Sequence, residues 1–63
     1  MPKYGDFDGL PSRYDNREAW VLHTDWTAIN HASHDNAVHE LTEAEFKQRF
    51  PDVPPLPAEA FKA

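Results

Sequence analysis

Four histidines in a short stretch are the residues of this sequence that point most directly to chemistry. His23, His31, His34 and His39 fall within seventeen positions, and acidic residues lie among them. The spacings His31-x2-His34 and His34-x4-His39 are short enough for one first-row metal ion, and imidazole suits zinc. We therefore consider a His-rich, metal-binding mini-domain in which His31, His34 and His39 hold zinc, with His23 or Asp35 as a further candidate ligand.

This metal site depends on local structure that the surrounding residues do not favour. A helix over 31–39 would align His31, Asp35 and His39 along one side at four-residue intervals. The Asn, Ser and Asp residues of this stretch favour turns instead, because their side chains bond to nearby backbone groups. In a polar turn without metal, the histidines would simply be hydrated, and this is the simpler interpretation.

Two other patterns contain the residue types of a known chemistry without the arrangement it needs. Ser33, His34 and Asp35 are the residue types of a hydrolytic triad, but three consecutive side chains diverge and do not form the required hydrogen bonds. Residues 6–9 have the acidic start of a calcium loop, yet the later glycine and glutamate of such a loop are missing. We therefore expect a protein that is not an enzyme.

The composition excludes several classes of protein. The 63 residues carry a net charge of −5 and include no cysteine, so disulfide-stapled mini-proteins and cysteine-type zinc fingers are excluded. With 6 basic residues against 11 acidic ones, no basic stripe is available to bind nucleic acid. No apolar run approaches the roughly 20 residues that span a membrane, and the first residues lack the apolar stretch of a signal peptide. We expect a cytoplasmic protein that binds neither nucleic acid nor membrane.

The clearest structural signal predicts a short helix over residues 43–50. Thr42 and Glu45 have the spacing of a capping box, in which each side chain bonds to the backbone N–H of the other residue. Acidic residues open the segment and basic residues close it, an order that suits the helix dipole. Pro51 ends the helix because it disfavours helical geometry in the residue before it.

A β-hairpin is the expected partner of this helix, which makes the fold a small α+β class. Residues 19–27 are rich in β-branched and aromatic types with alternating faces, and residues 37–41 form a shorter candidate strand. The turn formers between them predict a hairpin with a long loop. The alternative is an all-α fold with a helix at about 16–30, since apolar residues there also fit a helical stripe.

The two ends of the chain show no regular periodicity. Residues 1–18 are polar and turn-rich, and we expect them to form an irregular, extended N-terminal arm. Residues 51–63 begin Pro-Asp-Val-Pro-Pro-Leu-Pro and predict a Pro-rich C-terminal tail in a polyproline II conformation. The chain is thus one small domain, 1–63, whose folded unit is 19–50.

Function is expected to follow from the aromatic residues rather than from a catalytic motif. A short chain with many aromatic residues and two arms predicts a small non-enzymatic interaction protein, an accessory or structural component that docks on a larger assembly. Its partner would be another protein or a second copy of itself. An acidic inhibitor that mimics nucleic acid is a further alternative to the metal-binding domain. The candidate partner-binding residues are Trp20, Trp26, Tyr4, Phe7, Tyr14, Leu56 and Phe61.

Overall fold

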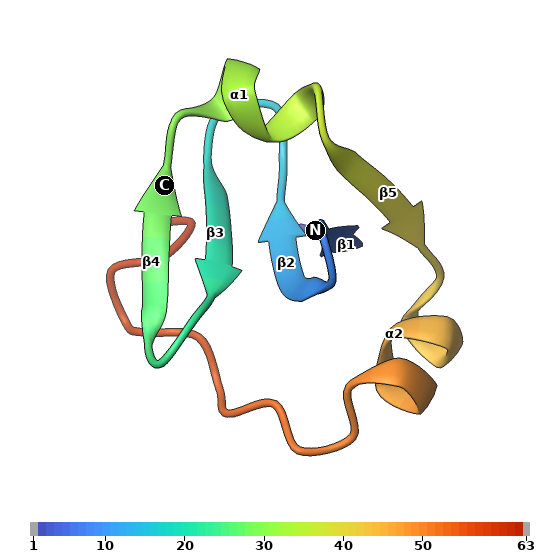
Figure 1. Ribbon diagram of the computed structural model, residues 1–63. Coiled ribbons are helices and arrows are strands. Elements are labelled where there is room, and N and C mark those ends of the chain that lie inside the picture. Colours follow the sequence, from blue (N-terminus) through green and yellow to red (C-terminus); the bar gives the residue numbers. More distant parts are fainter. Residues whose placement is uncertain (1, 63) are drawn as a thin grey trace.

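A computed structural model describes residues 2–62 and contains a five-stranded antiparallel sheet with two short helices (Figure 1). The α+β class is therefore confirmed, and the all-α alternative with a helix at 16–30 is wrong. The order of strands across the sheet is β4-β3-β2-β1-β5. The elements in chain order are β1 (Lys3–Phe7), β2 (Leu10–Tyr14), β3 (Ala19–Leu22), β4 (Trp26–Ile29), α1 (His31–Asp35), β5 (Val38–Leu41) and α2 (Glu43–Arg49).

The expected irregular arm over residues 1–18 is wrong, because most of this segment forms the first hairpin of the sheet. β1 and β2 pair antiparallel along their whole length. Asp8 and Gly9 connect the two strands with φ values of 53° and 91°. Two consecutive positive φ values are the geometry of a type I′ turn, which Asp-Gly pairs favour. The Asp6 carboxylate accepts a hydrogen bond of 2.6 Å from the Gly9 N–H and braces this turn.

The expected hairpin between residues 19–27 and 37–41 has the wrong partners. Residues 19–27 contain all of β3 and the start of β4, and these two strands pair with each other around a turn at 23–25. The strand expected at 37–41 exists as β5, but it pairs with β1. Strand periodicity shows which face of a strand is apolar and does not identify the neighbouring strand.

The segment expected to be a polar turn contains the short helix α1. Asn30 caps its first turn, since the Asn30 side chain accepts a hydrogen bond of 3.1 Å from the Ser33 N–H. Asn36 forms the other end of the helix and directs its N–H to the His34 carbonyl. The turn-forming residues therefore act as caps, a role in which Asn stabilises helix ends.

Helix α2 confirms the helix predicted at 43–50. The Thr42 hydroxyl accepts from the Glu45 N–H at 3.1 Å, and the Glu45 carboxylate accepts from the Thr42 N–H at 2.8 Å. The hydrogen bond from the Thr42 backbone N–H to the charged carboxylate is the main reason that the pKa of Glu45 lies below its usual value. In the part of the chain that the structure describes, neither helix is long and apolar enough to cross a membrane.

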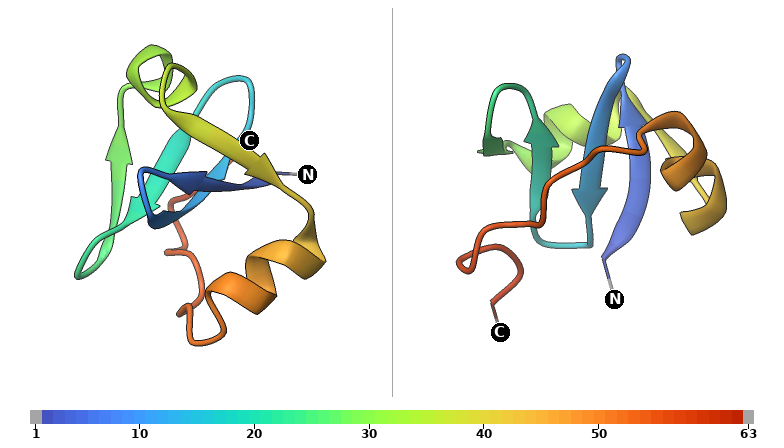
Figure 2. Two further views of the ribbon diagram at one scale, coloured as in Figure 1. Left: turned by 45° about the vertical axis from the view of Figure 1, so that its right-hand side comes forward. Right: turned by 90° about the horizontal axis from the view of Figure 1, so that it is seen from below.

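The two helices cover opposite faces of the sheet. Tyr4 on β1 contacts Phe46 of α2, with ring centroids 4.9 Å apart, while Tyr14 on β2 contacts His34 of α1 at 4.7 Å. We call the face that carries Tyr4 and α2 the groove face, and the face that carries Tyr14 and α1 the histidine face. After α2 the chain turns back and residues 51–62 cross the groove face toward β4 (Figure 2).

We predict that Gly5→Ala destabilises the fold, because the neighbours of β1 leave no space for a Cβ atom. A Cβ at Gly5 would lie 2.7 Å from Val38 Cγ2 and 2.9 Å from Tyr14 Cε1. Overpacking of this kind costs about 1–3 kcal/mol, and urea denaturation should show a loss in the upper part of that range. A variant as stable as the wild type would contradict the close approach of β5 to β1.

Gly9→Ala is the control for this substitution. A Cβ at Gly9 meets nothing within 4 Å, and only its φ of +91° opposes the change. The expected cost is about 1 kcal/mol, from the backbone conformation alone. The NMR signals of Val38 and Tyr14 should shift in the Gly5 variant and stay in place in the Gly9 variant.

Candidate functional site

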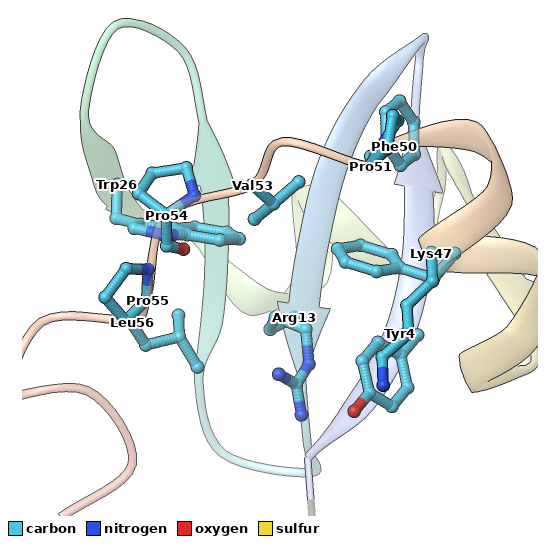
Figure 3. Close-up of a pocket in the computed structure, with 11 residues that line it drawn as sticks. Tyr4, Arg13, Trp26, Lys47, Phe50, Pro51, Val53, Pro54, Pro55 and Leu56 are labelled. Atoms are coloured by element: carbon cyan, nitrogen blue, oxygen red, sulfur yellow. The ribbon is translucent and has the colours of Figure 1, made fainter.

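A groove of about 410 Å³ lies on the groove face, between the sheet, α2 and the proline-rich segment (Figure 3). The strands contribute Tyr4, Arg13 and Trp26 to its lining. One wall is formed by the side chains at the end of α2, and the opposite wall by residues 53–56. The groove is therefore built from three segments that are far apart in the sequence.

The floor of the groove follows from the register of the sheet. Tyr4 on β1 lies opposite Arg13 on β2, and Arg13 lies opposite Trp20 on β3. Since directly opposed residues project from the same face, these three side chains form one row across the sheet, and Tyr4 and Arg13 of this row line the groove. The Arg13 guanidinium stacks on the Tyr4 ring, with Cζ 3.9 Å from the ring centroid, a favourable cation–π distance.

The Tyr4–Phe46 contact and the Arg49–Asp6 ion pair hold α2 against this floor, and further contacts lie within α2 and its C-cap. Phe46 is buried and packs on Phe50, with ring centroids 5.4 Å apart. The Arg49 guanidinium bonds to the Asp6 carboxylate on β1 at 2.6 Å. Lys47 lies at the groove with its ammonium 3.2 Å from Glu43, and this bond lowers the pKa of the Glu43 carboxyl.

Two hydrogen bonds fasten the proline-rich segment to the sheet and so close the far wall. The Trp26 indole N–H donates to the Pro54 carbonyl at 3.0 Å. Further along, the Phe61 N–H donates to the Glu18 carboxylate at 3.1 Å, and the same oxygen accepts from the Trp20 indole at 3.0 Å. Glu18 thus ties the end of the chain to β3.

The candidate partner-binding residues fall into three groups. The first group lines the groove, the second lies at Glu18, and the third packs around His34 on the histidine face. The first group shares the groove lining with the cations Arg13 and Lys47. Tyr4, Trp26 and Leu56 form the first group, Trp20 and Phe61 the second, and Phe7 and Tyr14 the third.

His34 is the centre of the histidine face and is 0% exposed. Its ring stacks on Phe7 with centroids 5.2 Å apart and planes at 7°, and it packs at a tilt against Tyr14. His34 Nε2 shares a hydrogen bond with the hydroxyl of Ser12, which is also 0% exposed. Burial raises the pKa of the Tyr14 phenol on the same face, with Glu40 and Asp35 adding to the effect.

The proton positions of this pair follow from its surroundings. His34 Nδ1 has no hydrogen-bond partner within residues 2–62, and its nearest acidic group is Asp35 Oδ1 at 3.9 Å. A bare nitrogen lone pair would face the carboxylate unfavourably, so Nδ1 carries the proton and Nε2 accepts from the Ser12 hydroxyl. The order hydroxyl, imidazole and carboxylate is that of a hydrolytic triad. The Ser12 hydroxyl and the His34 ring are both closed to solvent.

Of the other histidines, His31 lies beside the same Asp35 carboxylate as His34, while His23 and His39 lie elsewhere on the surface. His31 Nε2 donates to the Asp15 carbonyl at 2.7 Å, and its Nδ1 lies 3.5 Å from Asp35. His39 is exposed on β5 and His23 is exposed in the turn before β4. No group of three or more His, Asp or Glu residues within 2–62 is placed to hold a metal ion. The structure does not bring His31, His34 and His39 together as a zinc site.

The charged residues that line the groove, Arg13 and Lys47, were not among the candidate partner-binding residues. Arg13 belongs to the segment expected to be irregular, and its place opposite Tyr4 follows only from the β1–β2 register. Lys47 could have been selected as a candidate binding residue, because it lies between Phe46 and Phe50 at the end of a predicted helix. Their position at the groove depends on tertiary packing.

Comparison with known proteins gives no match. No protein-family model matches this sequence, no curated protein matches it, and no solved structure matches its fold. The function of the chain is therefore inferred from its own residues.

We predict that the protein loses stability as the pH falls below about 6.5, because of His34. Burial holds the pKa of His34 below its ordinary value of 6.5, although the nearby Asp35 carboxylate opposes this shift. The unfolded chain therefore binds a proton at a higher pH than the folded chain, and the difference destabilises the fold as acid is added. The melting temperature should be highest above about pH 7 and decrease from about pH 6.5 to pH 5.

The matched control for this pH dependence is His39→Gln, which removes an exposed histidine. Its melting temperature should follow the wild-type profile. His34→Leu should lose the decrease between about pH 6.5 and pH 5, whatever its absolute stability. NMR titration of the His34 ring in the wild type measures this pKa directly. An apparent pKa above 6.5 would contradict the prediction that burial lowers the pKa of His34.

Proposed function

We propose that this chain is a small non-enzymatic interaction protein that binds an acidic, partly apolar segment of a partner protein in its groove. The observation that supports this proposal is the chemistry of the groove lining. Aromatic and aliphatic side chains form the walls, and the charged side chains that line it, Arg13 and Lys47, are both cationic. They stand out in a chain whose net charge is −5.

The size and composition of the groove suit a peptide side chain and its neighbours. A volume of about 410 Å³ lies within the range of roughly 300–1,000 Å³ that is typical of ligand sites. Tyr, Trp and Arg are the residue types that contribute most to binding energy at protein interfaces. Tyr4, Arg13 and Trp26 are all half-buried, so their positions are fixed while part of each surface stays available.

The two cations define the charge of the expected partner. Arg13 is held in place by its stack on Tyr4 and by a hydrogen bond of 3.2 Å from its guanidinium to the Pro2 carbonyl. Lys47 is exposed and pairs with Glu43 only at the surface. A partner carboxylate could bond to both, since guanidinium and ammonium groups bind carboxylates by charge-assisted hydrogen bonds.

The proposal of a non-enzymatic role is supported by the state of the Ser12–His34 pair. Both side chains are fully buried under α1, so a substrate has no access to the hydroxyl. Among residues 2–62, no histidine, serine or acidic side chain that could act as a general base lines the groove.

We predict that acidic peptides bind in the groove and that their neutral counterparts bind at least about tenfold more weakly. The probes are synthetic peptides in which Asp and Glu alternate with Leu and Phe, the same peptides with Asn and Gln, and a third set with Lys. Binding is measured from chemical-shift changes of the full-length, ¹⁵N-labelled chain. Shifts should concentrate at Tyr4, Arg13, Trp26 and Lys47. Equal affinity for all three sets would contradict the proposed charge selectivity.

Two lysine substitutions provide the matched comparison for this experiment. Lys47→Gln removes a cation at the groove and should weaken acidic-peptide binding several-fold. Lys3→Gln makes the same change of charge on an exposed residue whose salt bridge is with Glu40. Because Lys3 does not line the groove, its variant should bind like the wild type. Equal losses in both variants would indicate that net charge alone attracts the peptide.

A further inference from the structure

The two edges of the sheet differ in how they are protected against pairing with another strand. β4 and β5 are the outer strands, and an edge strand presents backbone N–H and C=O groups that have no neighbour. β5 carries Glu40, which lies 3.8 Å from Lys3, and it leads directly into α2. Charged residues at an edge oppose the addition of a further strand.

The β4 edge lacks this protection. Its four residues, Trp26 to Ile29, include neither a charge nor a proline. Thr27 and Ala28 are exposed at its centre. The proline-rich segment lies out of the plane of the sheet here, because it is bonded to the Trp26 indole on the groove face; in the right-hand view of Figure 2 it crosses in front of β2.

We propose that β4 pairs antiparallel with β4 of a second copy of this chain, which joins two sheets into one continuous sheet across a two-fold axis. Homodimers with two-fold symmetry are the commonest oligomers, and the same surface patch then serves both copies. A strand without charges meets no like charge when it faces itself. The interface is distinct from the groove, although Trp26 belongs to both.

Symmetry limits the possible registers of this pairing. Opposed residues in an antiparallel pair project from the same face, and neighbouring residues in a strand project from opposite faces. The two-fold axis must therefore pass through a residue that pairs with the same residue of the second copy. The two residues at the centre of β4, Thr27 and Ala28, are the candidates for this position.

The Ala28-centred register is the better of the two. It places Thr27 opposite Ile29, and Asp25, at the end of the preceding turn, then lies beyond the paired residues. The Thr27-centred register would set Asp25 opposite the apolar side chain of Ile29, leaving the carboxylate without a partner. The small side chain of Ala28 also allows close approach at the axis.

The oligomeric state of the full chain tests the proposal. Sedimentation velocity over a roughly hundredfold range of concentration should show a reversible monomer–dimer equilibrium, since a dimer is favoured by mass action. Thr27→Lys places a charge on the β4 edge and should shift the midpoint to at least tenfold higher concentration. His39→Lys makes a similar change on the exposed face of β5 and should leave the midpoint unchanged. Far-UV circular dichroism confirms that each variant is folded.

Cysteine substitutions test the register, because the chain has no cysteine of its own. Opposed residues of an antiparallel pair have Cα atoms about 4.5–5.5 Å apart, which suits a disulfide. Ala28→Cys should form a covalent dimer under mild oxidation, faster than Thr27→Cys and much faster than His39→Cys. A wild type that remains monomeric throughout would overturn the proposal. So would a dimer that is insensitive to Thr27→Lys, or cross-linking that is fastest through His39→Cys.

Discussion

The hydrogen bond between Ser12 and His34 determines how α1 sits on the sheet. Both side chains are fully buried, and a buried polar group that loses its partner is costly, so the helix has one position in which the imidazole reaches the hydroxyl. In that position the ring also stacks on Phe7 and packs against Tyr14. The path of the chain then follows, because α1 directs β5 back across the sheet to β1. A histidine thus occupies the place that an aliphatic side chain has in most small cores.

The two faces of the sheet consequently have different roles. The histidine face contains most of the buried residues of the described chain, including Ala19 and Val21 as well as the polar pair. On the groove face only Phe46 is fully buried, and the remaining aromatic residues are covered in part. A side that is stabilised by tight packing leaves the other side available for binding. The cations Arg13 and Lys47 lie on that second side, and they are the charged side chains that line the groove.

Local signals in the sequence were sufficient to predict some structural elements and insufficient to predict others. Helix α2 was predictable because its capping box and its terminal charges lie within a few residues of one another. The first hairpin was also predictable in principle, since Asp8-Gly9 is a strong type I′ turn signal. In the groove, Tyr4, Trp26 and Leu56 could be selected as aromatic or apolar candidates. The burial of His34 could not be inferred, because its partner Ser12 is 22 positions away and nothing near His34 indicates the pairing.

The order of the strands has a consequence for how fast the chain folds. Three consecutive hairpins build β1 to β4, and each needs only a short loop to close. The pairing of β5 with β1 is different, since it joins segments more than thirty residues apart. Contacts between distant segments carry the larger loss of chain entropy, so this step is the slow one. The largest loop-closure cost of the sheet therefore falls on the segment from β1 to β5, and α1 lies within that segment.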